Sequence, residues 1–243
     1  MGVPGRNMGE VFSASLNGKG IRKIVPRGVV NTPKQLTVEP ISKKLYFCDR
    51  EGMKVTCCNY DGSDLEVLIN NGDSTTNGPV DQMKWCVGIA VSPKLGKFYW
   101  TQKGPSKAGQ GRIFCASLNE PTRDRKDIQL VIDKLPEPVD LEIDESTNTL
   151  YWTDRGELPI GKTLNQASLD PLTGLLVHTN STMPYRILAS HLNEAIGLKL
   201  DNEAGHIYVT DLGGSLYRFN KDGSGKQRVY WSDQRALSGI TIL

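Results

Sequence analysis

Short stretches of alternating apolar and polar residues recur along the whole chain, with turn-forming residues between them. Four of these stretches carry nearly the same letters at a spacing of about fifty residues, which indicates an internal repeat. The chain is therefore best interpreted as an array of similar units. The four copies are YFCD at 46–49, YWTQ at 99–102, YWTD at 151–154 and YVTD at 208–211.

The flanks of the four copies fall into register and predict three further strands in each unit. An apolar alternation precedes each copy, and two more strands follow it, joined by Asp-Gly-Ser turns at 61–63 and 222–224. Four short antiparallel strands without a helical period predict a β-propeller blade. A β-sandwich would also show alternation, but it gives no reason for one motif to recur at one place in every unit.

These motifs resemble the YWTD propeller family, known from the low-density lipoprotein receptor. The resemblance covers essentially the whole of residues 1–243, which we treat as a single propeller domain. It implies six blades, whereas the sequence contains five repeats, of which the terminal one is incomplete. We expect the segment 239–242 to join the strands near 10–16 and 21–25 in a closing blade. The alternatives are a piece of a longer six-bladed protein or a dimer formed through open blade edges.

Composition and charge exclude several partners. The net charge of +2 is spread without a basic stripe, so we expect no nucleic-acid partner. No apolar stretch is long enough to span a bilayer and the first residues lack a signal core, so we expect no membrane partner. Five cysteines at irregular spacing suit buried thiols in a reducing compartment, which predicts a cytoplasmic protein.

The antiparallel order of the strands places the long connections on one face of the propeller. These are the connections between the second and third strands and those between units, and we expect binding on this face. The inner strands should line the channel at Gln35, Gly88, Asp140, Gly197 and Gly239. One carboxylate among these residues makes a poor ligand set, so we predict no metal site and no cofactor.

Two residues are candidates for proton transfer. Asp140 could act as a general acid or base at the channel mouth, and the alternative is a structural role. Glu142 lies on the same strand face and is expected to pair with Lys199 of the next unit. His191 lies in a connection on the binding face, where it could transfer protons near neutral pH. An ordinary loop histidine is the competing interpretation.

Ligand contacts are expected from the same face. The unusual loop at 73–85 ends with two apolar side chains that could form the wall of a pocket or plug the channel. Three cations follow the repeated motifs at matching places and could attract an anionic or carbonyl-rich ligand. The predicted ligand-binding residues are Trp85, Met83, Gln35, Arg155, Arg50, Lys103 and Glu137.

The sequence thus predicts a propeller that binds a small organic ligand at the channel mouth. Such a protein could be a cofactor-independent enzyme that catalyses a cyclisation, isomerisation or addition on an organic metabolite. A non-catalytic protein-interaction propeller is the alternative, and it predicts a flat face with exposed aromatic residues.

Overall fold

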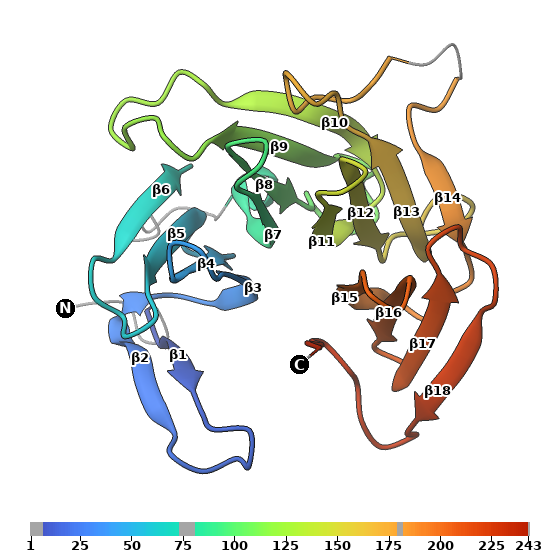
Figure 1. Cartoon of the computed structure of the whole chain (residues 1–243), viewed down its shortest axis with the longest axis horizontal. Coiled ribbons are helices and arrows are strands. Elements are labelled where there is room, and N and C mark those ends of the chain that lie inside the picture. Colours follow the sequence, from blue (N-terminus) through green and yellow to red (C-terminus); the bar gives the residue numbers. More distant parts are fainter. Residues whose placement is uncertain (1–6, 73–80, 179–181, 243) are drawn as a thin grey trace.

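Four sheets surround a common axis, so the ring in Figure 1 is a β-propeller. The computed structural model describes residues 7–72, 81–178 and 182–242. Each complete sheet contains four antiparallel strands in chain order, with the first strand nearest the axis and the fourth at the outside (Figure 1). The predicted fold class, an all-β propeller of four-stranded blades, is confirmed.

We number the complete blades 1 to 4 in chain order and give their strands from the axis outward. Blade 1 contains β3 (Pro33–Glu39), β4 (Lys44–Asp49), β5 (Lys54–Asn59) and β6 (Glu66–Asn70). Blade 2 contains β7 (Cys86–Ser92), β8 (Lys97–Gln102), β9 (Gly111–Ser117) and β10 (Gln129–Leu135). Blade 3 contains β11 (Pro138–Asp144), β12 (Thr149–Asp154), β13 (Thr163–Ser168) and β14 (Arg186–Ala189). Blade 4 contains β15 (Ala195–Asp201), β16 (His206–Asp211), β17 (Ser215–Asn220) and β18 (Gln227–Trp231).

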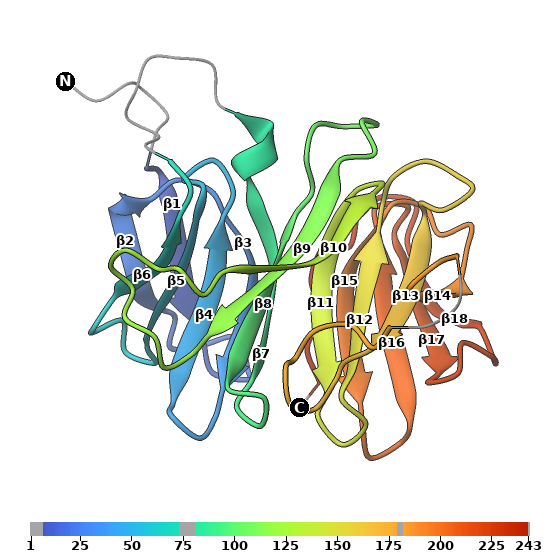
Figure 2. The same ribbon diagram turned by 90° about the horizontal axis from the view of Figure 1, so that it is seen from above.

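Two further elements complete the described chain. A two-stranded sheet pairs β1 (Gly9–Ser13) with β2 (Arg22–Val30), and a short 3-10 helix, η1 (Gln82–Lys84), precedes β7. Figure 2 shows η1 and the connections that follow β8 and β12 on one face of the ring, with the short hairpins between inner strands on the opposite face. In the described residues, no helix is long and apolar enough to cross a membrane.

The alternation along each second strand decides which neighbouring blade its side chains contact. In β12, Tyr151 packs with Leu198 and Val209 of blade 4. The next residue, Trp152, points to the opposite side and packs with Tyr99 of blade 2. The expectation that the repeated aromatic residues form the core between blades is therefore correct.

The threonine of the repeated motif joins each blade to the next through its hydroxyl group. The Thr153 hydroxyl accepts a hydrogen bond from the backbone N–H of Asp140 (3.1 Å) in its own blade and donates one to the carbonyl oxygen of Ile196 (2.8 Å) in blade 4. Thr101 makes the same pair of bonds between blades 2 and 3, at 2.7 and 2.9 Å. A buried hydroxyl therefore satisfies two backbone groups where inner strands approach each other.

The aspartates that end the motifs cap backbone groups, as the sequence predicts. Asp154 accepts hydrogen bonds from the N–H of Gly156 in the following loop (2.8 Å) and from the N–H of Glu137 (3.0 Å), which precedes the inner strand. Asp49 and Asp211 hold the corresponding backbone groups in blades 1 and 4. Each carboxylate therefore orders two connections on the face that carries the long loops.

The expected closing blade does not form in the part of the chain that the structure describes. Residues 239–242 adopt no strand and lie against β15, where a Cβ added to Gly197 would approach the Cα of Gly239 to 3.2 Å. The sheet of β1 and β2 instead packs on blade 1, where Val25 and Phe47 share one cluster. Each terminal piece is held by its own neighbouring blade, so an opening remains between them (Figure 1).

The structure also shows the predicted ion pair between blades and the state of the cysteines. The Lys199 ammonium lies 2.5 Å from the Glu142 carboxylate, so the predicted ion pair between adjacent blades is confirmed. All five cysteines are buried free thiols, as expected for small apolar side chains in a core.

Replacing the threonine that joins blades 3 and 4 should destabilise the propeller. Thr153→Val keeps the volume but leaves the N–H of Asp140 and the carbonyl of Ile196 without their partner, at a cost of about 2–4 kcal/mol in the free energy of unfolding. Denaturant unfolding of the purified variant measures this change. The exposed Thr147 provides a matched Thr→Val control, expected to change stability by less than about 0.5 kcal/mol. Equal losses in both variants would contradict the role given to the Thr153 hydroxyl.

Candidate functional site

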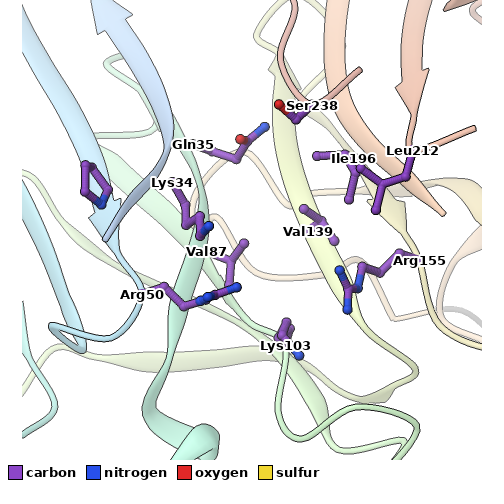
Figure 3. A pocket seen from close by; sticks show the side chains of 11 residues that line it. Lys34, Gln35, Arg50, Val87, Lys103, Val139, Arg155, Ile196, Leu212 and Ser238 are labelled. Atoms are coloured by element: carbon purple, nitrogen blue, oxygen red, sulfur yellow. The ribbon is translucent and has the colours of Figure 1, made fainter. Parts of the chain in front are cut away.

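A cavity of about 320 Å³ opens at the channel mouth, on the face that carries the long connections. Its wall is built from repeated positions, namely the beginnings of the inner strands and the residues that follow the second strands. Figure 3 shows the side chains around it. The lining residues are Pro33, Lys34, Gln35, Arg50, Val87, Lys103, Val139, Arg155, Ile196, Leu212 and Ser238.

The backbone holds these positions in equivalent places in several blades. The N–H of Arg50 donates to the carbonyl of Thr32 (3.0 Å), and the N–H of Arg155 donates to the carbonyl of Glu137 (3.0 Å). Each bond ties the residue after a second strand to the connection before its inner strand. The aspartate caps hold the same connections. The backbone that carries the cationic side chains is therefore well ordered.

Part of the wall is apolar. Val87, Val139 and Ile196 come from three successive inner strands and form a small buried cluster. They occupy the same position in each strand, immediately before Gly88, Asp140 and Gly197 in the chain. The cavity can therefore accept a hydrocarbon or ring surface as well as a charge.

Four cations surround the mouth, and two of them share one buried carboxylate. Glu137 accepts a hydrogen bond from the Arg155 Nε (2.7 Å) and lies 3.6 Å from the Lys103 Nζ. Arg50 pairs with Glu51, with its Nε 2.6 Å from the carboxylate. These contacts lower the pKa of Glu137 despite its burial, which by itself would raise it.

Lys34 differs from the other three cations because its ammonium has no ion pair or hydrogen bond with the described residues. Burial lowers the pKa of the Lys34 amine, and the nearby positive charge of Arg50 lowers it further. Burial likewise lowers the pKa of Lys103, partly offset by Glu137. The mouth therefore concentrates positive charge that the protein itself only partly neutralises.

Trp85 lies at the mouth between two of these cations. The Arg50 guanidinium is 5.0 Å and the Lys103 Nζ 5.6 Å from the centre of its ring. Both distances suit cation–π attraction. The buried indole Nε1 has no hydrogen-bond partner in the described part of the chain. The ring thus orders two cationic side chains and leaves one donor unsatisfied.

Asp140 does not line the cavity, although Gln35, which does, is a hydrogen-bond partner of its side chain. It is buried, and its two oxygens accept hydrogen bonds from the N–H groups of Leu141 (3.0 Å) and Leu198 (2.9 Å). Burial raises the pKa of Asp140 to about 7, although these bonds oppose the rise. The geometry favours the structural role that the sequence left open, because the carboxyl group joins the inner strands of blades 3 and 4.

Two predicted site residues lie away from the mouth. Leu192 is buried in blade 4's core, so the preceding His191 points outward, where its Nδ1 lies 2.9 Å from the Ser190 hydroxyl. Met83 lines a separate hollow of about 310 Å³ beside Arg112. Residues 73–80 of the predicted loop lie outside the described residues. Neither His191 nor Met83 lines the channel-mouth cavity, and their roles in the site stay predictions.

Four of the lining residues were predicted from the sequence, whereas the position next to them was not. Gln35, Arg50, Lys103 and Arg155 line the cavity as expected, with Trp85 and Glu137 in contact with those cations. Two of the glycines at the expected channel positions, Gly88 and Gly197, instead permit a close approach of neighbouring chain segments. A Cβ on Gly88, for example, would lie 1.8 Å from the carbonyl oxygen of Val139. The missed residues precede those positions, and the repeat alignment contained that signal: Lys34, Val87, Val139, Ile196 and Ser238.

Within the described residues, no group of three or more His, Cys, Asp or Glu side chains is placed to hold a metal ion. The expectation that the protein needs neither metal nor cofactor remains a prediction.

Comparison with known proteins places the chain in a family. No model of a known protein family matches it. The "Low-density lipoprotein receptor-related protein 1" of Pyricularia oryzae is 44% identical over 238 residues, which cover 97% of this chain and 76% of that protein. The chain belongs to the low-density lipoprotein receptor-related YWTD propeller family. A vitellogenin receptor of Solenopsis invicta is 30% identical over 120 residues, 49% of this chain and 6% of that receptor.

A second fungal relative of this YWTD propeller is considerably longer. The "3-hydroxyacyl-CoA dehydrogenase-like protein LAM1" of Cochliobolus heterostrophus is 45% identical over 249 residues, which cover 100% of this chain and 52% of that protein. The YWTD propeller therefore spans about half the length of this relative.

Solved structures agree on the fold. A chain of the nidogen/laminin complex has a TM-score of 0.70 at 18% identity, over 95% of this chain and 75% of that chain. The gluconolactonase XC5397 of Xanthomonas campestris has a TM-score of 0.68 at 15% identity, over 98% of this chain and 72% of that chain. At these identities the likeness concerns the propeller fold alone.

The buried carboxyl group of Asp140 should give stability a distinctive pH dependence. Its folded pKa of about 7 lies above its ordinary value of 3.8, so the fold favours the protonated form. This contribution is fully present below about pH 4 and is lost as the pH rises through 7. The stability of the wild type relative to Asp140→Asn should therefore fall across this range, by roughly 4 kcal/mol at most.

Urea unfolding at several pH values measures this difference. Asp133→Asn changes an exposed aspartate and should leave the pH dependence of the wild type unaltered. If Asp140→Asn follows the wild type at every pH, Asp140 does not titrate in the way that its burial implies.

Proposed function

We propose that the channel mouth binds a small organic anion. The observation that carries this proposal is the group of four cations, Lys34, Arg50, Lys103 and Arg155, around one cavity. Among the described residues, Lys34 makes no ion pair or hydrogen bond, and the attraction of Glu51 offsets its charge only in part. Buried or half-buried cations that repel one another are stabilised by an anion between them. A carboxylate or phosphate group satisfies this requirement, and Arg50 and Arg155 suit two-point contact with either.

The rest of the cavity favours an organic ligand over a bare inorganic ion. The wall of Val87, Val139 and Ile196 offers apolar surface directly beside the cations. A volume of about 320 Å³ is at the lower end of the range of small-molecule sites. A hollow of this kind supports a small ligand more than the flat aromatic face expected of a protein-interaction propeller.

Isothermal titration with a panel of carboxylates and inorganic phosphate tests the proposal, with citrate as the first probe. Lys34→Met removes the unpaired charge and keeps much of the side-chain volume. We expect it to weaken citrate binding at least tenfold, about 1.4 kcal/mol, without loss of folding. The affinity of the wild type should also fall with added salt, because the mouth is open to solvent.

Lys19→Met is the matched control, since Lys19 is exposed in the connection between β1 and β2, away from the cavity. It makes the same change in net charge and should leave binding unchanged. Trp85→Ala should weaken binding more modestly by freeing Arg50 and Lys103. Equal effects of Lys34→Met and Lys19→Met, or no binding by any member of the panel, would count against this site.

A second candidate is catalysis at the same mouth without a cofactor, and the lowered pKa of Lys34 favours it. An amine with a lowered pKa is more often unprotonated near neutral pH and can act as a base or nucleophile in an isomerisation, addition or cyclisation of an organic metabolite. The name gluconolactonase, given to the structural neighbour XC5397, is compatible with catalysis on this fold, whereas the dehydrogenase-like name of LAM1 implies a hydride acceptor that this candidate does not include.

The reactivity of Lys34 can be measured directly against another lysine of the same chain. Pyruvate and sodium cyanoborohydride at pH 7.5 should modify Lys34 faster than the exposed Lys19, by at least about threefold, because more of its amine is unprotonated. Peptide mapping by mass spectrometry gives both rates in one sample. Equal rates, or slower modification of Lys34, would argue against a catalytic amine.

We further propose a cytoplasmic location, supported by five buried cysteines that remain free thiols. The protein is proposed to work as a monomer or as a dimer that forms through its open blade edges. Mass measurement in solution distinguishes the two states.

A further inference from the structure

The inner strand of blade 1 exposes apolar side chains whose counterparts in other blades are buried. Leu36 is 42% exposed and Val38 is 51% exposed. Their counterparts in blade 3, Leu141 and Ile143, are 1% and 8% exposed. The pairing register confirms the equivalence, because Leu36 pairs with Phe47 as Leu141 pairs with Trp152. Blade 1 therefore has an uncovered strip along β3.

In the other blades this strip is covered by the second strand of the preceding blade. Tyr99 of β8 shares a core cluster with Leu141 and Ile143 of blade 3. Two residues further along, the hydroxyl of Thr101 donates to the carbonyl of Val139. The covering strand thus presents a tyrosine and a threonine on one face, in the pattern Tyr-x-Thr.

The sheet of β1 and β2 occupies the place where the preceding blade would lie, but it covers only the outer part of blade 1. Its Val11 and Val25 pack with Phe47 and Cys58. Among the described residues, β1 pairs with β2 alone, so its other edge has no strand partner. In complete blades the corresponding edge of the third strand pairs with the second strand. Figure 1 shows β1 beside the opening of the ring.

We propose that the free edge of β1 binds an extended strand of a partner polypeptide with the pattern Tyr-x-Thr. The tyrosine covers Leu36 and Val38, and the threonine hydroxyl donates to the carbonyl of Lys34, which occupies the position of Val139 in blade 3. Backbone hydrogen bonds to β1 supply affinity, and the two side chains supply selectivity, as in other cases of strand addition. An exposed sheet edge beside an apolar strip is the arrangement that such a partner requires.

The interfaces between the other blades indicate which kind of strand would occupy the uncovered face of blade 1. Three interfaces between consecutive complete blades show a motif strand against the next inner strand, and in each a tyrosine at the same position lies in the core: Tyr46, Tyr99 and Tyr151. The interface before blade 1 has the same receiving residues without that strand. The proposal rests on other observations than the anion site, namely a sheet edge and an apolar strip.

A peptide with the chain's own motif tests the proposal. A fluorescently labelled, end-blocked peptide of residues 148–155, NTLYWTDR, serves as the probe in anisotropy titrations with the whole protein. Leu36→Asp places a charge in the strip and should weaken binding at least tenfold. Val38→Asp should act in the same way and provides a second test if Leu36→Asp melts at a lower temperature.

Matched controls distinguish binding at this interface from non-specific binding of the peptide. Leu172→Asp alters a side chain that is 92% exposed on a distant loop and should leave binding unchanged. Tyr230→Asp alters an exposed side chain of β18 in blade 4 and should also have no effect. Peptides with serine in place of the tyrosine, or valine in place of the second threonine, should bind more weakly than the parent.

Three results would overturn the proposal. The first is no saturable binding of the motif peptide, and the second is equal loss of binding in Leu36→Asp and Leu172→Asp. The third is a wild-type dimer that Leu36→Asp converts to a monomer, since a second copy of this chain would then be the occupant.

Discussion

The buried threonine hydroxyl between inner strands is the interaction on which the propeller depends. Thr153 accepts from the N–H of Asp140 and donates to the carbonyl of Ile196, and thereby fixes the distance between two blades at the axis. The residue whose carbonyl accepts this bond also lines the channel mouth, as Ile196 and Val139 both do. The geometry of the site is therefore set by the contact that closes one blade on the next. In blade 1 the motif has Cys48 instead, and its thiol donates a weaker bond to the carbonyl of Gly88 (3.2 Å), one residue beyond the position of Val139 and Ile196.

Electrostatic strain at the mouth is balanced by a few buried acids. Glu137 neutralises part of the charge of Lys103 and Arg155, and its own backbone N–H is held by Asp154. The capping aspartate thus supports the fold and positions the counter-ion of the site. Lys34 lies outside this arrangement, since β3 carries it at the edge of blade 1 that faces the ring opening. The asymmetry between paired and unpaired cations gives the mouth its preference for an anion.

Sequence patterns predicted the blades well because every unit repeats the same packing. Tyr151, Trp152, Thr153 and Asp154 each have one role that follows from strand alternation and hydrogen-bonding capacity, so the four copies indicate the fold together. The site was only partly predictable. Arg50, Lys103 and Arg155 follow the motif directly and could be placed, whereas His191 lies in a connection whose backbone direction depends on burial of its neighbour Leu192. The positions of the chain ends could not be predicted either. Residues 239–242 lie against β15, and the pattern of apolar and polar residues in a segment does not say which blade that segment will contact.

The open edge and the anion site meet on one strand. β3 carries Lys34 at the mouth and Leu36 in the uncovered strip, and it is the one inner strand of the four described blades without a bond from the side chain of a preceding motif strand. Its carbonyl at Lys34 therefore lacks the restraint that Val139 and Ile196 receive. A strand bound at the edge of β1 would supply that restraint and would fix the backbone of Lys34 toward the cavity. By linkage, anything that orders β3 at one of these places favours binding at the other. The two proposals rest on separate observations, but the strand that they share makes positive coupling between partner and anion the physical consequence of both.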